Sequence, residues 1–125
     1  MNTSEIIKST CKSWGYDEQK ANAFVIALSK FIQSGEVTLM RESDTVILFK
    51  YLDEESVEFH IFTVDQPMAL ANAMSKMYEA FRSSNIKYGE STTDNPAIIK
   101  LAQRVGIPIQ AHKLGDRYQV EIEVQ

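Results

Sequence analysis

The spacing of apolar residues divides the chain into helical and extended segments. Helical spacing, with apolar side chains three or four positions apart, covers residues 3–15 and 17–35, and each segment ends at a glycine. Thr3 or Ser4 is the expected N-cap of the first helix, and Asp17 that of the second. The apolar stripes comprise Ile7, Cys11 and Trp14, and then Ala21, Phe24, Val25, Leu28, Phe31 and Ile32. We expect a helical hairpin that packs on a sheet.

Alternation at residues 37–41 and runs of β-branched and aromatic residues after them predict that sheet. Residues 37–41, 45–51 and 57–64 are rich in β-branched and aromatic side chains and are joined by short polar turns. Strands in such close succession pair as an antiparallel meander. The third strand runs through Asp65 and Gln66 directly into a helix. We expect the binding site at this junction, because the free N–H groups of a helix N-terminus attract anions.

The helix after the junction has the most regular pattern in the chain. It begins at Pro67, a position where the backbone N–H has no partner within the helix, so the missing N–H of proline costs no hydrogen bond. Its apolar stripe consists of Leu70, Met74, Met77 and Phe81. We interpret this stripe, methionines included, as core packing rather than as an adaptable binding surface. The next strand, residues 86–88, must lie parallel to residues 57–64, because a helical crossover joins the two.

The last part of the chain alternates between helix and strand. A cap cluster at residues 92–96 opens a helix that ends at Gly106, and strands follow at residues 107–112 and 118–124 around a turn at 113–116. The sequence thus predicts an α/β (α+β) fold, in which a mixed, mostly antiparallel sheet with a central parallel strand pair is flanked by helices.

We expect the chain to form one domain. Its parts are a helical hairpin over residues 1–35 and a sheet core with two crossover helices over residues 36–125. With 44% apolar residues, 24% charged residues and a net charge of -4, the composition is that of a globular protein without a dedicated nucleic-acid surface. The sequence shows no membrane span and no secretory signal, so we expect a cytoplasmic protein.

Cysteine and histidine add little chemistry. The single cysteine, Cys11, excludes an internal disulfide, and its place in a helical pattern indicates a buried thiol. His60 and His112 are far apart and have no metal-ligand spacing, so we expect no metal site. The acidic residues 53–55 are interpreted as a solvated turn rather than a cation site.

The order of the elements and two local segments resemble the GNAT superfamily of N-acetyltransferases. In that superfamily a strand ends at a Q/R-x-x-G-x-G/A loop, whose backbone amides hold the pyrophosphate of acetyl-CoA. Residues 66–71 read Gln-Pro-Met-Ala-Leu-Ala. Gln66 and Ala71 match the pattern, whereas Ala69 stands where the central glycine should be.

The second segment resembles the N-x-x-A-x-x-L-Y-x-K-x-G-F helix of the same superfamily. The matched positions are Asn95, Leu101, Arg104 (for the basic residue) and Gly106, and the unmatched ones are Ile98, Ala102 and Ile107. Ala102 replaces the tyrosine that commonly serves as general acid, and an alanine has no proton to give.

The resemblance spans about residues 37–124 and implies the GNAT fold with an acetyl-CoA site. The residues that it places at the cofactor are Val64, Gln66, Ala69, Ala71 and Asn95. A methyl group at Ala69 hinders the close backbone approach that glycine allows, and no lysine or arginine lies in the loop. The usual first strand of the family is not evident before the helical hairpin. We therefore predict a degenerate site, with acetyl-CoA as the candidate cofactor.

Catalysis would need a general base and an acid. Glu58 and His60 share one face of the strand at residues 57–64 and are candidates for the base. The alternative is a solvated carboxylate and a surface or half-buried histidine. Tyr88 is a candidate for the missing acid, as are Tyr78 and Tyr118, and the alternative for each is packing with the hydroxyl at the surface.

Two functions follow from the resemblance. The first is a GNAT-like domain that has lost acetyl transfer and serves as a binding or structural module, with a protein partner or self-association. The second is a divergent acetyl-CoA-dependent N-acyltransferase that acts on a small-molecule or protein amine. We favour the first because both the glycine and the tyrosine are missing. Short GNAT-like proteins are familiar from bacteriophage genomes, so the resemblance extends to a phage source, in the host cytoplasm or the virion.

Overall fold

The computed structural model describes all residues from Met1 to Gln125. The helices are α1 (Thr3–Ser13), α2 (Glu18–Gln33), α3 (Pro67–Ser83) and α4 (Pro96–Arg104). The strands are β1 (Thr38–Glu42), β2 (Thr45–Tyr51), β3 (Ser56–Thr63), β4 (Tyr88–Thr93), β5 (Ile109–Leu114) and β6 (Arg117–Glu123). The predicted order of helices and strands is confirmed along the whole chain.

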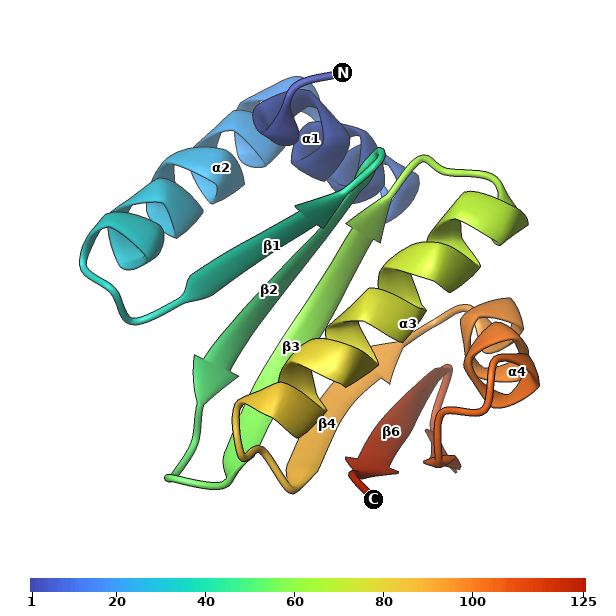
Figure 1. The fold of residues 1–125 in the computed structure, drawn as a ribbon. Coiled ribbons are helices and arrows are strands. Elements are labelled where there is room, and N and C mark those ends of the chain that lie inside the picture. The colour runs from blue at the N-terminus through green and yellow to red at the C-terminus, as the bar shows by residue number, and fades with distance from the viewer.

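All six strands join one sheet in the order β1-β2-β3-β4-β6-β5. Every neighbouring pair is antiparallel except β3 and β4, which are parallel. That pairing covers only Ser56–Glu58 against Tyr88–Glu90, after which the two strands diverge toward their carboxyl ends (Figure 1). The mixed sheet with a central parallel pair, predicted from the crossover helix, is confirmed. The divergence opens the sheet where β3 and β4 lead into α3 and α4.

Helices cover the sheet on both faces and bury two separate clusters of apolar side chains. α3 and α4 lie over one face, where the larger cluster of 13 buried residues contains Phe81 and the rest of the predicted α3 stripe. α1 and α2 lie over the other face, against β2 and β3 (Figure 1), and enclose a cluster of seven. Cys11 is buried there, as predicted, and burial raises the pKa of its thiol.

One predicted helix cap is wrong and one is confirmed. The N-cap of α1 is Asn2, not Thr3 or Ser4: its Oδ1 accepts a bond from the Glu5 N–H at 2.9 Å, while Glu5 Oε1 accepts one from the Asn2 N–H at 3.3 Å. This reciprocal capping box satisfies two groups at once, which a cap one residue later would not. The N-cap of α2 is Asp17, as predicted.

The boundaries of two strands differ from the prediction by two residues or more. β4 begins at Tyr88 rather than at Ile86, because the Ile86 N–H closes the end of α3 on the Phe81 carbonyl at 3.1 Å. Thr92 and Thr93, expected in a cap cluster, extend β4 because they pair with β6. In the same way Ile107 closes α4 on Ala102, so β5 runs over Ile109–Leu114 and not over residues 107–112.

Candidate functional site

The junction between β3 and α3 has an open helix N-terminus. Gln66 is the N-cap of α3, but its side chain makes no capping hydrogen bond, and the first turn contains no acidic residue. The N–H groups of Met68 and Ala69 lack partners within the helix, as at any helix start. Ala69 does not have a positive φ, so its side chain is accommodated without backbone strain. The structure thus keeps the anion-attracting helix end that the sequence predicts.

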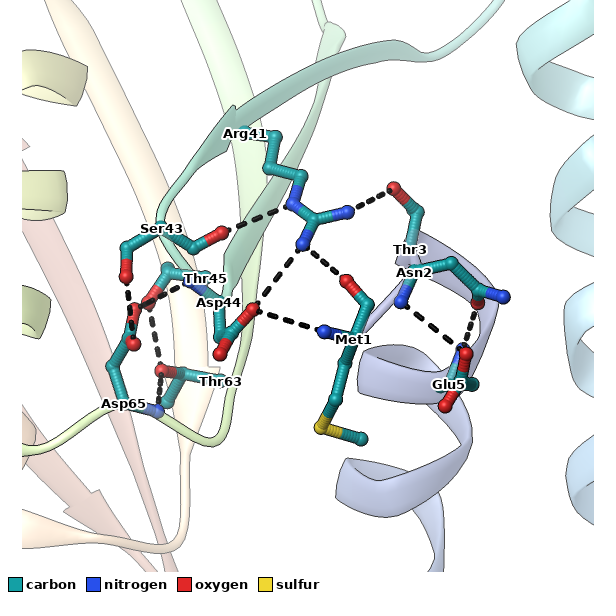
Figure 2. Close-up of polar contacts among 10 residues, drawn as sticks. All are labelled: Met1, Asn2, Thr3, Glu5, Arg41, Ser43, Asp44, Thr45, Thr63 and Asp65. Atoms are coloured by element: carbon teal, nitrogen blue, oxygen red, sulfur yellow. Dashed lines mark hydrogen bonds and ion pairs between the residues drawn. The ribbon is translucent and has the colours of Figure 1, made fainter.

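Asp65, directly before the N-cap, ties this junction to the turn between β1 and β2 (Figure 2). Its Oδ2 accepts hydrogen bonds from the Asp44 N–H at 3.0 Å and the Thr45 hydroxyl at 2.8 Å. Its Oδ1 accepts one from the Ser43 hydroxyl at 3.0 Å. The Asp65 N–H donates to the Thr63 hydroxyl, which lies 2.7 Å from that of Thr45. This carboxylate braces the fold, and it puts negative charge next to the helix end.

Arg41 carries the same network to the chain start and is itself fully engaged (Figure 2). Its guanidinium donates to the Ser43 carbonyl at 3.0 Å, to the Thr3 hydroxyl at 3.3 Å and to the Met1 carbonyl. It also lies 3.2 Å from the Asp44 carboxylate. The loop from Val64 to Ala71 therefore has no basic side chain of its own, and the arginine of the neighbouring turn is already paired.

The other residues that the resemblance places at a cofactor have structural partners. The Val64 N–H donates to the Asp44 carbonyl at 3.2 Å, and the Val64 side chain is partly exposed. Asn95 is the N-cap of α4, where its Oδ1 accepts a bond from the Ala97 N–H at 3.0 Å. Ala102 is fully buried. Beside it, the apolar hollow between α3, α4 and the diverging strands measures about 40 Å³.

Replacing Asn95 by alanine tests whether this side chain serves the helix. We expect the change to lower the free energy of unfolding by about 1 kcal/mol, the usual cost of losing an N-cap. Asn95→Asp is the matched control, because aspartate caps equally well and should leave the denaturation midpoint within error. An unchanged midpoint in the alanine variant would mean that the cap contributes nothing and that Asn95 is free for another role.

A larger hollow lies on the opposite face of the sheet, which we call the hairpin cleft. It has a volume of about 530 Å³ between the α1–α2 hairpin and the sheet. Glu58 and His60 lie on its floor, two residues apart on β3, and His60 Nε2 is 2.9 Å from Glu58 Oε1. The structure thus brings the two predicted base candidates together in a cleft, with both side chains open to solvent.

The third catalytic candidate is not part of the hairpin cleft. Tyr88 begins β4, is 51% exposed and lines a different hollow with Asp53 and Glu90, near the start of β3. Tyr78 packs beside the core of α3, where its hydroxyl accepts a bond from the Gln125 N–H at 3.1 Å. Neither Tyr88 nor Tyr78 therefore lies at the Glu58–His60 pair.

Sequence reasoning missed the aromatic wall of the hairpin cleft. Periodicity predicts Trp14 and Phe31 on buried helix faces, which is wrong: they are 37% and 47% exposed and line the cleft. Trp14 is exposed because it lies at the C-cap of α1, beyond the helix proper. Phe31 is exposed because α2 buries only one residue fully, Ala21, near its other end. Phe24 completes the wall and lies edge-on to Trp14, with ring centroids 6.1 Å apart. Periodicity alone does not show where a helix overhangs its sheet.

Comparison with solved structures identifies the fold as that of the GNAT N-acetyltransferases. The N-acetyltransferase PseH of Campylobacter jejuni, solved in complex with acetyl coenzyme A, superposes with a TM-score of 0.64 at 18% identity, over 100% of this chain and 94% of that one. The microcin C7 self-immunity acetyltransferase MccE, in complex with acetyl-CoA and AMP, gives 0.63 at 13% identity, over 98% and 84%. A variant of the spermidine N-acetyltransferase SpeG of Vibrio cholerae gives 0.62 at 12% identity, over 96% and 89%.

These similarities are in structure and not in sequence. No family model matches the chain, and no curated protein matches it. At such low identities the superpositions show the fold alone, so the GNAT-like fold predicted from the sequence is confirmed. Separately, none of the four helices is both long and apolar enough to cross a membrane.

Proposed function

We propose that this protein is a GNAT-fold binding module that has lost acetyl transfer. The observation that carries the proposal is the α3 N-terminus: it has Ala69 in place of glycine, no basic side chain from Val64 to Ala71, and the Asp65 carboxylate next to its N-cap. A pyrophosphate needs close backbone approach and benefits from basic side chains, whereas this helix end has a methyl group at Ala69 and no lysine or arginine. The residues present do not fit acetyl-CoA.

Two further features support the same proposal. The position that aligns with the general acid is the fully buried Ala102, which cannot protonate a leaving thiolate. The hollow of about 40 Å³ next to it is far smaller than the roughly 300–1,000 Å³ of sites that hold drug-sized ligands. The hairpin cleft, at about 530 Å³, falls within that range. The hollow lined by Tyr88, at about 790 Å³, falls within the range too, and it is the aromatic lining of the hairpin cleft that favours the α1–α2 face for the ligand.

Acetyl-CoA titration by calorimetry tests the proposal. We expect no saturable heat with the natural chain and no release of CoA when a mixture of primary amines is added. Ala69→Gly should restore weak binding, because it removes the methyl group from the phosphate approach. Ala71→Gly is the matched control, since position 71 already fits the GNAT pattern and should gain nothing. Tight binding by the natural chain together with turnover would overturn the proposal.

One observation favours the second candidate, a divergent acetyl-CoA-dependent N-acyltransferase. The carboxylate of Glu58 and the imidazole of His60 lie 2.9 Å apart on the floor of a cleft, an arrangement that can take a proton from an amine. Glu58→Gln would then abolish the turnover described above.

Source and partners belong to the same proposal. A phage-encoded protein in the host cytoplasm or the virion stays a prediction from the small size of the domain. A protein partner or self-association also stays a prediction.

A further inference from the structure

A second large hollow, which we call the basal hollow, lies at the end of the sheet away from the α3 N-terminus. It has a volume of about 790 Å³ and lies where β3 and β4 begin and β6 ends. α1 and α2 pack on β2 and β3 and leave this part of the sheet without a helix over it (Figure 1). Its exposed lining side chains include those of Leu52, Asp53, Tyr88, Glu90, Glu121 and Glu123.

The charge of the basal hollow has one sign. Four carboxylates line it, and none of its 17 lining residues is a lysine, an arginine or a histidine. The chain has 17 acidic and 13 basic residues, so these four carboxylates equal its whole formal net charge of -4. No basic side chain lies within 4.0 Å of any of the four. The neighbouring Lys87 is paired with Glu55 at 3.2 Å, and Lys50 lies opposite Glu58, outside the hollow.

Strand register places two of these carboxylates directly opposite each other. Glu90 on β4 pairs with Glu121 on β6, and both side chains are exposed. They alternate with Gly89 and Ile122, which are buried toward α3 and α4, so the two carboxylates share the outer face of the sheet. Like charges directly opposite each other on neighbouring strands destabilise a sheet. The fold therefore keeps an unfavourable pair of charges that a cationic partner would stabilise.

An exposed aromatic ring and an exposed aliphatic side chain lie beside the carboxylates. The Leu52 N–H donates to the Ser56 carbonyl at 2.8 Å, and Ser56 pairs with Tyr88, so Leu52 and Tyr88 lie on either side of Ser56. Tyr88 is also directly opposite Glu123. A ring next to a carboxylate favours arginine over lysine, because a guanidinium stacks on the ring and donates two parallel hydrogen bonds to the carboxylate.

We infer that the basal hollow docks an arginine-rich segment of a partner protein. One guanidinium lies between Tyr88 and Glu123, and a second lies over the pair formed by Glu90 and Glu121. All four carboxylates are exposed, which suits an extended segment lying across the sheet rather than an enclosed small molecule. The inference rests on the protein partner of the proposed function and names the chemistry of that partner. It does not depend on what the hairpin cleft binds.

Short probes that differ in the kind of charge test the inference by fluorescence anisotropy. The probes are fluorescein-labelled tetra-arginine, tetralysine and tetraglutamate. We expect saturable binding of tetra-arginine, binding of tetralysine that is about two- to fivefold weaker because lysine stacks less well, and none of tetraglutamate. Added salt should weaken both cationic peptides. Spermine, a small cation of about the same charge, should compete less well than unlabelled tetra-arginine. Equal competition by spermine would overturn the assignment to a polypeptide.

A double substitution tests whether the opposed carboxylates hold the peptide. Glu90→Gln together with Glu121→Gln should weaken tetra-arginine about tenfold. The matched control, Glu36→Gln together with Asp94→Asn, removes the same charge from exposed sites outside the hollow and should have little effect. The first pair should also raise the thermal midpoint, because it removes two opposed like charges. A lowered midpoint, or an equal loss of binding in the control, would overturn the inference.

Tyr88 tests the preference for arginine. Tyr88→Leu should remove the difference between tetra-arginine and tetralysine, whereas Tyr88→Phe, which keeps the ring, should preserve it. Tyr88 is exposed, so both variants should fold. An unchanged preference in Tyr88→Leu would mean that the guanidinium lies elsewhere and would overturn the inference.

The results distinguish this inference from the proposed function. The basal hollow lies at the start of β3, whereas the α3 N-terminus follows the end of β3. Acetyl-CoA binding with turnover would therefore overturn the proposed function and leave tetra-arginine binding in place. Absence of saturable tetra-arginine binding would overturn the inference while acetyl-CoA titration still tested the module. A dimer of the natural chain that Glu90→Gln with Glu121→Gln dissociates would assign the hollow to a second copy and would also overturn it.

Discussion

Replacing Phe81 by alanine is expected to lower the free energy of unfolding by about 3–5 kcal/mol. Phe81 is fully buried near the end of α3, and its ring lies edge-on to Phe49 and Phe59, with centroids 6.0 Å away in both cases. A Cβ added at Gly89 would come within 3.2 Å of the same ring, so the β4 backbone also packs on it. The cavity that the missing Phe81 ring leaves cannot collapse easily, because strands from the middle of the sheet line it.

Chemical denaturation of Phe81→Ala measures this loss, and Phe31→Ala is the matched control. Both changes remove a phenyl ring from a helix, but Phe31 is 47% exposed and should cost no more than about 0.5 kcal/mol. Similar midpoints for the two variants would show that the stripe of α3 is not the centre of the larger core.

The sequence predicts the long helices and strands because burial of one apolar face dominates the stability of each of them. The α3 stripe has four large apolar residues at helical spacing, and all of them are buried against the sheet. The crossover rule then determines that β3 and β4 are parallel, whatever the packing details. Features with one strong cause, such as the Asp17 cap, are predictable in the same way.

Element ends and the cleft depend on competing local bonds and on tertiary placement. Asn2 prevails over Thr3 and Ser4 as a cap because Glu5 returns its hydrogen bond. Thr92 is a good cap residue that extends a strand instead, since β6 offers it a partner. The hairpin cleft exists only because α1 and α2 leave part of the sheet uncovered, which no sequence period records.

The candidate site could be predicted only in part, because it also depends on tertiary contacts. The junction at Gln66 is where the sequence indicates, and Glu58 and His60 do meet on one face. The sequence could not reveal that Asp65 binds a turn about twenty residues earlier in the chain, because an aspartate next to a helix start indicates only a local role. The network in Figure 2 makes the junction a structural brace.

That brace gives the last prediction: Asp65→Ala should lower the free energy of unfolding by about 2–4 kcal/mol. Hydrogen bonds to a charged group contribute about 1.5–3 kcal/mol each, and the Asp65 carboxylate accepts three, one of them from the fully buried Thr45. Water can reach this partly exposed site and replace some of them, so the full sum is not expected.

The neighbouring carboxylate is the control for charge. Asp44 pairs with Arg41 at 3.2 Å and with the amino group of Met1 at 3.7 Å, both at the surface, so Asp44→Ala should cost no more than about 1 kcal/mol. Thermal and urea denaturation should therefore give clearly different midpoints for the two variants. Equal midpoints would mean that general charge, and not the three bonds, matters at the junction. A large loss for Asp65 alone would show that this carboxylate serves the connection between the β1–β2 turn and the start of α3.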